Sequence, residues 1–280
     1  MATLSVYEAG HCTHPACMVL RGAGWGACAF PARAWMIEAA GRRWLWDTGY
    51  ASHFADHTSD GLYRLYPLVT PVHFDSHQAL AAQLARHGLK PWDFDGIIAS
   101  HFHADHIAGL RDFPGLPILC SGAGWEITRQ RRGLAALRRA FVPGLMPSDT
   151  EARLRFIEGF EPIALPAALA PFGSGWVLPG SRREVLLVEL PGHAAGHIGA
   201  FVLTAEGWQL LAADAAWAAQ NYTERVPPSR LSHLIMEDPR QYHRTLDQLH
   251  QLHRGGQVRI RLTHESTPAT DLQPPETTPC

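Results

Sequence analysis

The six residues from His101 to His106 carry three imidazoles and one carboxylate in the pattern His-x-His-x-Asp-His. They follow the apolar run Gly96–Ala99, which is typical of a strand that ends in a loop. Imidazole and carboxylate groups bind Zn²⁺, and also Fe, Mn or Co. Such groups are costly to bury without partners, so core packing does not explain four of them together. The sequence therefore predicts that His101, His103, Asp105 and His106 are metal ligands.

Three further candidate ligands stand at the ends of later apolar runs. Each alone is weak evidence, because a polar residue after a strand is usually a cap or turn residue. Together they repeat one arrangement, a strand followed by a ligand, which is how a rigid scaffold presents a metal site. The candidates are His193 after Leu186–Leu190, Asp214 after Leu210–Ala213 and His264 after Arg259–Thr263.

The elements that must position these side chains can be read from apolar patterning. Helices are predicted over Ser76–His87 and Pro239–His253. Because strands and helices alternate, we expect a mixed α/β architecture in a single domain covering residues 1–280. The predicted strands are Arg33–Ala39, Arg43–Trp46, Gly96–Ser100, Pro117–Cys120, Glu184–Leu190, Gly199–Leu203, Gln209–Ala212 and Val258–Leu262.

Residues 122–176 lie between the two halves of the candidate ligand set. Their arginines interleave with leucines in a way that predicts a basic amphipathic helix. One interpretation is an ordinary solvated helix face. The other is a helical insertion that caps the site, where it would reach a substrate. The residues concerned are Arg129, Arg131, Arg132, Leu134, Leu137, Arg138 and Arg139.

The order of these motifs, together with Asp47-Thr48-Gly49 after Trp44–Trp46, resembles the metallo-β-lactamase superfamily over residues 35–264. The resemblance implies a four-layer αββα sandwich, of the α/β (α+β) class, with two divalent metal ions at one edge. It implies that Asp47 orients a ligand loop and that His197 is structural. By motif position, one ion would be held by His101, His103 and His193, the second by Asp105, His106 and His264, and Asp214 would bridge them.

Two ions about 3.5–4 Å apart can bind a shared water and make it a hydroxide nucleophile near neutral pH. The implied reaction class is metal-assisted hydrolysis, with Zn²⁺ as the expected metal and Fe, Mn or Co as alternatives. Asp105 is the candidate catalytic residue, since it would orient the hydroxide and carry a proton to the leaving group.

For the substrate, residues 88–93, 100–110 and 190–198 resemble the N-acyl homoserine lactonases, which open an ester ring and hold an acyl chain in an apolar groove. Those lactonases carry a tyrosine three residues after the bridging Asp, where this chain has Trp217. Trp217 offers only an indole N–H donor, and Tyr222 is the alternative source of a hydroxyl. Ordinary core packing is the expectation for most of the candidate groove residues, which are Trp25, Trp35, Phe141, Leu145, Met146 and Trp217.

Other interpretations remain open. A thioesterase like glyoxalase II would need a C-terminal helical domain, and too few residues follow His264 for one. A phosphodiesterase that acts on nucleic acid would need a basic surface, and the net charge of −2 does not favour one. A β-lactamase usually acts outside the cytoplasm, and no signal peptide is evident. Redox iron proteins of this fold usually have a Glu near Ala104 or Asp105. A non-enzymatic, metal-dependent ligand-binding protein is less expected, because the ligand set is complete.

The composition narrows the partners. A formal net charge of −2 over 280 residues gives no indication of nucleic acid or an anionic membrane surface, so we expect a small-molecule substrate. Five scattered cysteines and no evident signal peptide favour a cytoplasmic location. An exposed apolar N-terminal loop would be compatible with a homodimer. The segment His11–Cys17 holds two His and two Cys and is interpreted as a loop near the active site or, alternatively, a third metal site.

Overall fold

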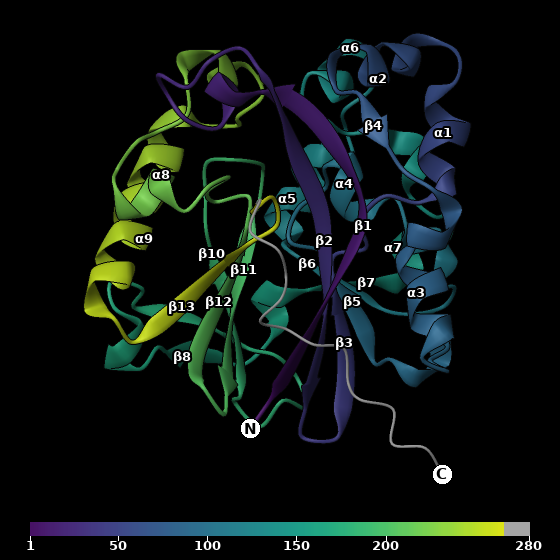
Figure 1. The fold of residues 1–280 in the computed structure, drawn as a ribbon. Helices are drawn as coiled ribbons and strands as arrows, with labels where there is room; N and C mark the ends of the chain where they lie inside the picture. The colour runs from purple at the N-terminus through teal and green to yellow at the C-terminus, as the bar shows by residue number, and fades with distance from the viewer. Residues whose placement is uncertain (266–280) are drawn as a thin grey trace.

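The computed structural model describes residues 1–265, in which two β-sheets pack face to face with helices on their outer sides (Figure 1). The fifth cysteine, Cys280, lies outside the described residues. In order across the first sheet, the strands are β4 (Val72–His73), β1 (Thr3–Pro15), β2 (Ala27–Ala39), β3 (Arg42–Trp46), β5 (Gly96–Ile98), β6 (Ile118–Cys120) and β7 (Leu154–Phe156). Across the second they are β13 (Val258–Leu262), β12 (Gly207–Ala213), β11 (Ile198–Thr204), β10 (Val185–Glu189), β9 (Ser174–Val177) and β8 (Pro162–Ala164).

Helices cover both outer faces and complete four layers. Figure 1 shows α1 and α3 outside the first sheet, and α8 and α9 outside the second. The predicted α/β sandwich is therefore confirmed. Within residues 1–265, no helix has the length and apolar character that a membrane span requires. The α-helices are α1 (Ser52–Thr58), α2 (Tyr66–Val69), α3 (Leu80–Arg86), α4 (Ala104–Ile107), α5 (Gly122–Thr128), α6 (Gly133–Leu137), α7 (Thr150–Arg153), α8 (Gln220–Thr223) and α9 (Pro239–Gly255).

The long helix α9 forms as its sequence predicts. Asp238 caps its first turn by accepting from the backbone N–H groups of Arg240 and Gln241. Gly256 ends it in the left-handed conformation. Its buried face packs Leu249 and Tyr242 into the core, and each fully buried side chain of this size contributes about 1.5–3 kcal/mol.

The strand directions decide where the site forms. Strands β3, β5 and β6 run parallel, and so do β12 and β13. Strand β10 runs in the same direction as β12, because each is antiparallel to β11. Parallel strands of one sheet end on the same side of it. The loops that follow β3 and β5 therefore start together in the first sheet, and those that follow β10, β12 and β13 start together in the second.

Several predicted boundaries differ from the structure. Residues 122–176 are helical only in part, because β7 within them joins the first sheet, while β8 and β9 join the second. Leu134 and Leu137 of α6 line the cavity over the candidate ligands, where the capping interpretation placed this segment. The predicted basic helix is broken, since α5 ends at Thr128 and α6 begins at Gly133, which has φ +58°. The predicted helix 76–87 is a 3₁₀ turn, Ser76–Gln78, followed by α3. The predicted N-terminal loop is mostly strand, since β1 continues to Pro15.

Candidate metal centre

Seven buried side chains meet where the segments after β5, β10, β12 and β13 converge. They form two groups, and within each the potential ligand atoms all lie within 4.8 Å of one another. The structure thus brings together every candidate metal ligand that the sequence singled out. The first group is His101, His103, His193 and Asp214, and the second is Asp105, His106 and His264.

Asp214 touches both groups. Its Oδ2 lies 3.2 Å from Nε2 of His193 in the first group and 3.0 Å from Nε2 of His264 in the second. Its Oδ1 lies 3.3 Å from Nε2 of His106. One carboxylate therefore stands between the two groups, which is the bridging position that the resemblance implies.

The donor atoms fit a pair of metal ions. Among residues 1–265, His101 Nε2, His106 Nε2 and Asp214 Oδ1 are buried and have no hydrogen-bond partner. A buried polar atom left unpaired costs about 1–3 kcal/mol, and three at one place call for an occupant that accepts lone pairs. Nitrogen and carboxylate donors in this mixture suit Zn²⁺, Fe, Mn or Co. The two buried clusters are thus consistent with a dinuclear metal site.

The histidines of the site differ in the direction in which their pKa values are shifted. Burial and the neighbouring imidazoles hold the pKa values of His101 and His103 well below the usual range. Burial alone would also lower the pKa of His106, but the carboxylates of Asp47, Asp105 and Asp214 raise it well above that range. This excess of negative charge on one side attracts cations, either protons or metal ions, and the two compete for the same nitrogens.

Asp47 holds the ligand loop in place, as predicted. It is fully buried, and its Oδ1 accepts from the backbone N–H of Ser100 at 2.7 Å. Its Oδ2 accepts from the Ser100 hydroxyl at 2.8 Å and lies 2.7 Å from Nδ1 of His106. A proton on Nδ1 leaves the Nε2 lone pair of His106 facing the cluster.

Strained backbone supports the same positions. Asp47 and Ala213, the residue before Asp214, have φ values of +56° and +44°, which side-chain-bearing residues rarely adopt. Each such residue costs of order 1–3 kcal/mol and persists only where the surrounding structure fixes it. Both lie next to the site, where the surrounding fold holds the backbone in this conformation.

Comparison with known proteins decides the family. The family model of the metallo-beta-lactamase superfamily matches residues 29–253. The chain belongs to the metallo-beta-lactamase superfamily.

Relatives within the superfamily are distant. An N-acyl homoserine lactonase of Bacillus cereus is 32% identical over 146 residues, which cover 51% of this chain and 47% of the relative. A probable metallo-hydrolase of Mycobacterium bovis is 28% identical over 181 residues, covering 61% and 52%. The matches span about half the length of these curated relatives.

Solved structures of the superfamily share the whole fold. An N-acyl homoserine lactone hydrolase with N-hexanoyl-L-homoserine bound at its catalytic metal center superposes with a TM-score of 0.70 at 22% identity, covering 94% of this chain and 93% of that one. AidC, a dizinc quorum-quenching lactonase, gives 0.66 at 13% identity, covering 95% and 88%. At these identities the likeness establishes the fold.

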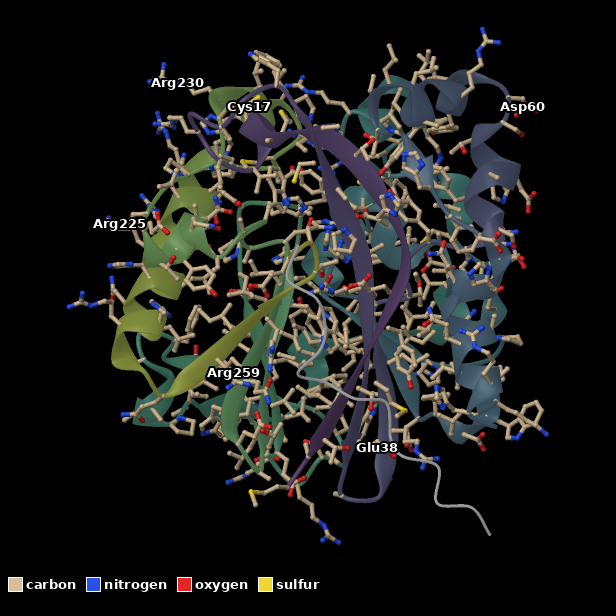
Figure 2. The ribbon with its side chains drawn as sticks, viewed as in Figure 1. Cys17, Glu38, Asp60, Arg225, Arg230 and Arg259 are labelled. Carbon is tan, nitrogen blue, oxygen red and sulfur yellow. The ribbon has the colours of Figure 1, made fainter. Side chains whose placement is uncertain are left out.

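In this superfamily member a cavity of about 660 Å³ opens over the two clusters. Its floor includes Asp105 and Asp214. Its wall includes Met18 and Leu231. Their chain neighbours Cys17 and Arg230 are labelled in Figure 2, at the opposite end of the molecule from Glu38. The remaining lining residues are mostly apolar: Cys12, His14, Pro15, Phe30, Tyr50, Tyr66, Val69, Thr70, His103, Leu134, Leu137, Arg138, Ala140, His193, Trp217, Leu234, Ile235 and His264.

Most of the candidate groove residues are elsewhere. Trp217 lines the cavity, but Trp25 is 75% exposed outside it, and Trp35 is buried between the sheets. Phe141 and Leu145 belong to the core, as expected for most of this set, and Met146 packs against it. Tyr222 does not line the cavity and instead contacts His253 on α9.

The structure also identifies cavity residues that the sequence did not indicate. The buried Tyr50 hydroxyl lies close enough to the Cys12 thiol and to Tyr66 for both to raise its pKa, in addition to the effect of burial. A tyrosine that directly follows Asp-Thr-Gly was the available signal. In the segment His11–Cys17, Cys12 and His14 line the cavity, and the segment enters neither ligand cluster. That placement agrees with the segment lying near the site.

Proposed function

We propose that this protein is a dinuclear metal-dependent hydrolase of small-molecule esters or lactones, with N-acyl homoserine lactones as the leading substrates and Zn²⁺ as the leading metal. The observation that carries the proposal is a pair of buried His/Asp clusters, joined by Asp214, on the floor of a largely apolar cavity. When bound, two ions there would supply an activated water and would polarise a carbonyl oxygen.

The chain's own residues support water as the attacking group. Cys12 is a cysteine that lines the cavity, and burial, with Asp105 nearby, raises the pKa of its thiol well above its usual value. A thiol that stays protonated is a poor nucleophile. In hydrolysis of a lactone, water adds to the acyl carbon, the ring C–O bond breaks, and the leaving oxygen needs a proton.

We infer that Asp105 moves that proton. Its carboxylate lines the cavity, with Oδ2 3.4 Å from Nε2 of His264 and 3.7 Å from Nε2 of His106. It would accept the proton that the water loses and deliver it to the leaving oxygen, because its carboxylate lines the cavity in which both would bind. The acyl chain would lie against the apolar wall formed by Met18, Leu134 and Leu137.

A substrate panel tests the proposal. Metal-replete protein should hydrolyse N-acyl homoserine lactones or simple esters, and chelator-treated protein should not. If thioesters, phosphodiesters or β-lactams are hydrolysed in preference, the proposed substrate class is wrong and the assignment as a hydrolase stands. Binding of a lactone without any turnover would favour a metal-dependent ligand-binding protein.

Replacement of Asp105 by Asn tests its role. The amide cannot carry a proton at this position, so we expect kcat to fall by about 10²–10⁴-fold, the usual range for a proton-transfer group. Metal content is measured alongside by elemental analysis. Asp112→Asn is the matched control, because Asp112 pairs with His53 outside the cavity. Full turnover by metal-loaded Asp105→Asn protein would rule out the role.

A further inference from the structure

Trp217 stands three residues after Asp214, where the resembling lactonases have a tyrosine hydroxyl. Its indole Nε1–H donates a hydrogen bond to Oδ2 of Asp214 at 3.1 Å. The side chain is buried, with 5% of its surface exposed. The polar atom of this residue is therefore directed at the carboxylate that joins the two clusters.

The contacts around Asp214 make this hydrogen bond distinctive. The same Oδ2 lies 3.0 Å from Nε2 of His264 and 3.2 Å from Nε2 of His193. Those imidazole nitrogens either carry protons or give their lone pairs to metal ions. An indole nitrogen always carries its proton and has no lone pair for a metal ion, so it is a permanent donor. Once the imidazoles bind metal, the Trp217 hydrogen bond still holds Oδ2, while the described residues 1–265 offer Oδ1 no hydrogen-bond donor.

The indole is itself held from several sides. The backbone N–H of Trp217 donates to Oδ1 of Asn221 at 2.9 Å. The Asn221 amide donates in turn to the carbonyls of Val19 and Val226, at 2.8 and 2.9 Å. The ring packs edge-on against His193, with centroids 5.6 Å apart. The donor is thus fixed before any ligand arrives.

We infer that Trp217 is a positioning residue that orients the metal-bridging carboxylate through its indole N–H, in place of a hydroxyl that contacts substrate. The inference rests on the proposed function only in that Asp214 holds metal. According to this inference, the tryptophan that replaces the lactonases' tyrosine acts in metal binding. This position then offers the substrate carbonyl no hydroxyl donor.

The test compares metal affinity in proteins that keep or lose the N–H. Trp217→Phe keeps an aromatic ring without the donor. A second variant, with β-(3-benzothienyl)alanine at position 217, keeps the bicyclic shape and replaces the N–H by sulfur, which serves if the Phe variant does not fold. The control is Trp208→Phe, near the start of β12, the strand that leads to Asp214. Zn²⁺ affinity is measured by chelator competition, and the Co²⁺-loaded proteins are compared by visible absorption.

We expect both variants at position 217 to bind Zn²⁺ at least about 10-fold more weakly than wild type, the usual effect of losing a hydrogen bond to a ligand, and their Co²⁺ spectra to shift. The control should match wild type. Unchanged affinity in the variants would overturn the inference, and so would lost lactone turnover with metal binding intact, which would mean that the ring acts on substrate. If wild type binds two metals and hydrolyses no ester or lactone, the proposed function fails while the affinity comparison still decides the role of Trp217.

Discussion

His197 is a buried imidazole beside the metal centre whose two ring nitrogens are both engaged by the backbone. Nδ1 lies 2.9 Å from the Leu190 carbonyl, and Nε2 accepts from the backbone N–H of Asp214 at 3.2 Å. No ring nitrogen is left for a metal, in keeping with the predicted structural role. Burial, with His193 nearby, lowers the pKa of His197 to about 3. The folded protein therefore keeps this imidazole neutral, whereas the unfolded chain protonates it near pH 6.5.

This difference predicts a pH-dependent stability. A group with a lowered folded pKa makes its full contribution above about pH 6.5 and loses it as the pH falls toward about 3. In metal-free protein, the stability advantage of wild type over His197→Gln should shrink by about 1.4 kcal/mol between pH 7.5 and 5.5. Urea unfolding of both proteins at the two pH values measures it. A gap that stays constant with pH would show that His197 does not titrate in this way.

At the scale of elements, Gly192 sets the distance between the end of β10 and the start of α9. It has φ +122°, and a Cβ there would lie 2.0 Å from the backbone nitrogen of Tyr242. The Gly192 carbonyl accepts from the N–H of Asp238, and the His193 carbonyl accepts from that of Glu237. The turn that presents His193 is thus packed directly on the residues that begin the helix.

Gly192→Ala should therefore damage both stability and metal binding. The control is Gly207→Ala, since Gly207 has φ +102° with nothing within 4 Å of the added Cβ. The control should lose about 1–3 kcal/mol from backbone strain alone and keep its metal. The Gly192 variant should lose more and should purify with less metal, because His193 must move. Urea unfolding and metal analysis measure the two effects, and equal losses in both variants would contradict this account.

The elements differ in how far the sequence predicts them. Strands β5, β10, β12 and β13 are short apolar runs followed by a polar candidate ligand, so both the strands and the candidate ligands are visible in the sequence. The end of β1 is not, because Gly10 and the polar residues after it resemble a loop. Pairing with β2 maintains the strand, with a register shift between Glu8 and His11. Tertiary pairing overrides local propensity there.

The cavity wall was the least predictable part of the site. Phe30, Tyr50 and Leu134 come from segments far apart in the sequence and meet only once the sheets and short helices are assembled. Nothing in their local pattern distinguishes a large side chain that lines a cavity from one that fills the core. Trp35, proposed for the groove, lies instead between the sheets, because alternate residues of a strand face opposite sides.

At the scale of the whole molecule, the metal centre lies across the junction of the two sheets. The segment after β5 in the first sheet carries His101, and segments of the second sheet carry Asp214 and His264. In the second candidate group, Asp105 and His264 come from segments that follow strands of different sheets, β5 and β13. Ions bound there would crosslink the two layers, in addition to the apolar packing between them.

Removal of metal should consequently lower the stability of the entire domain. Binding at about 1,000 times the dissociation constant contributes about 4 kcal/mol, and for a domain of this size each kcal/mol shifts Tm by about 2–4 °C. We expect chelator-treated protein to melt roughly 8–16 °C lower, with recovery when Zn²⁺ is restored, as followed by circular dichroism. Asp214→Asn, which removes the shared ligand, should show little shift with chelator. A wild-type Tm that does not respond to chelator would mean that the two sheets do not depend on bound metal, and the seven buried ligands would then need another explanation for their convergence.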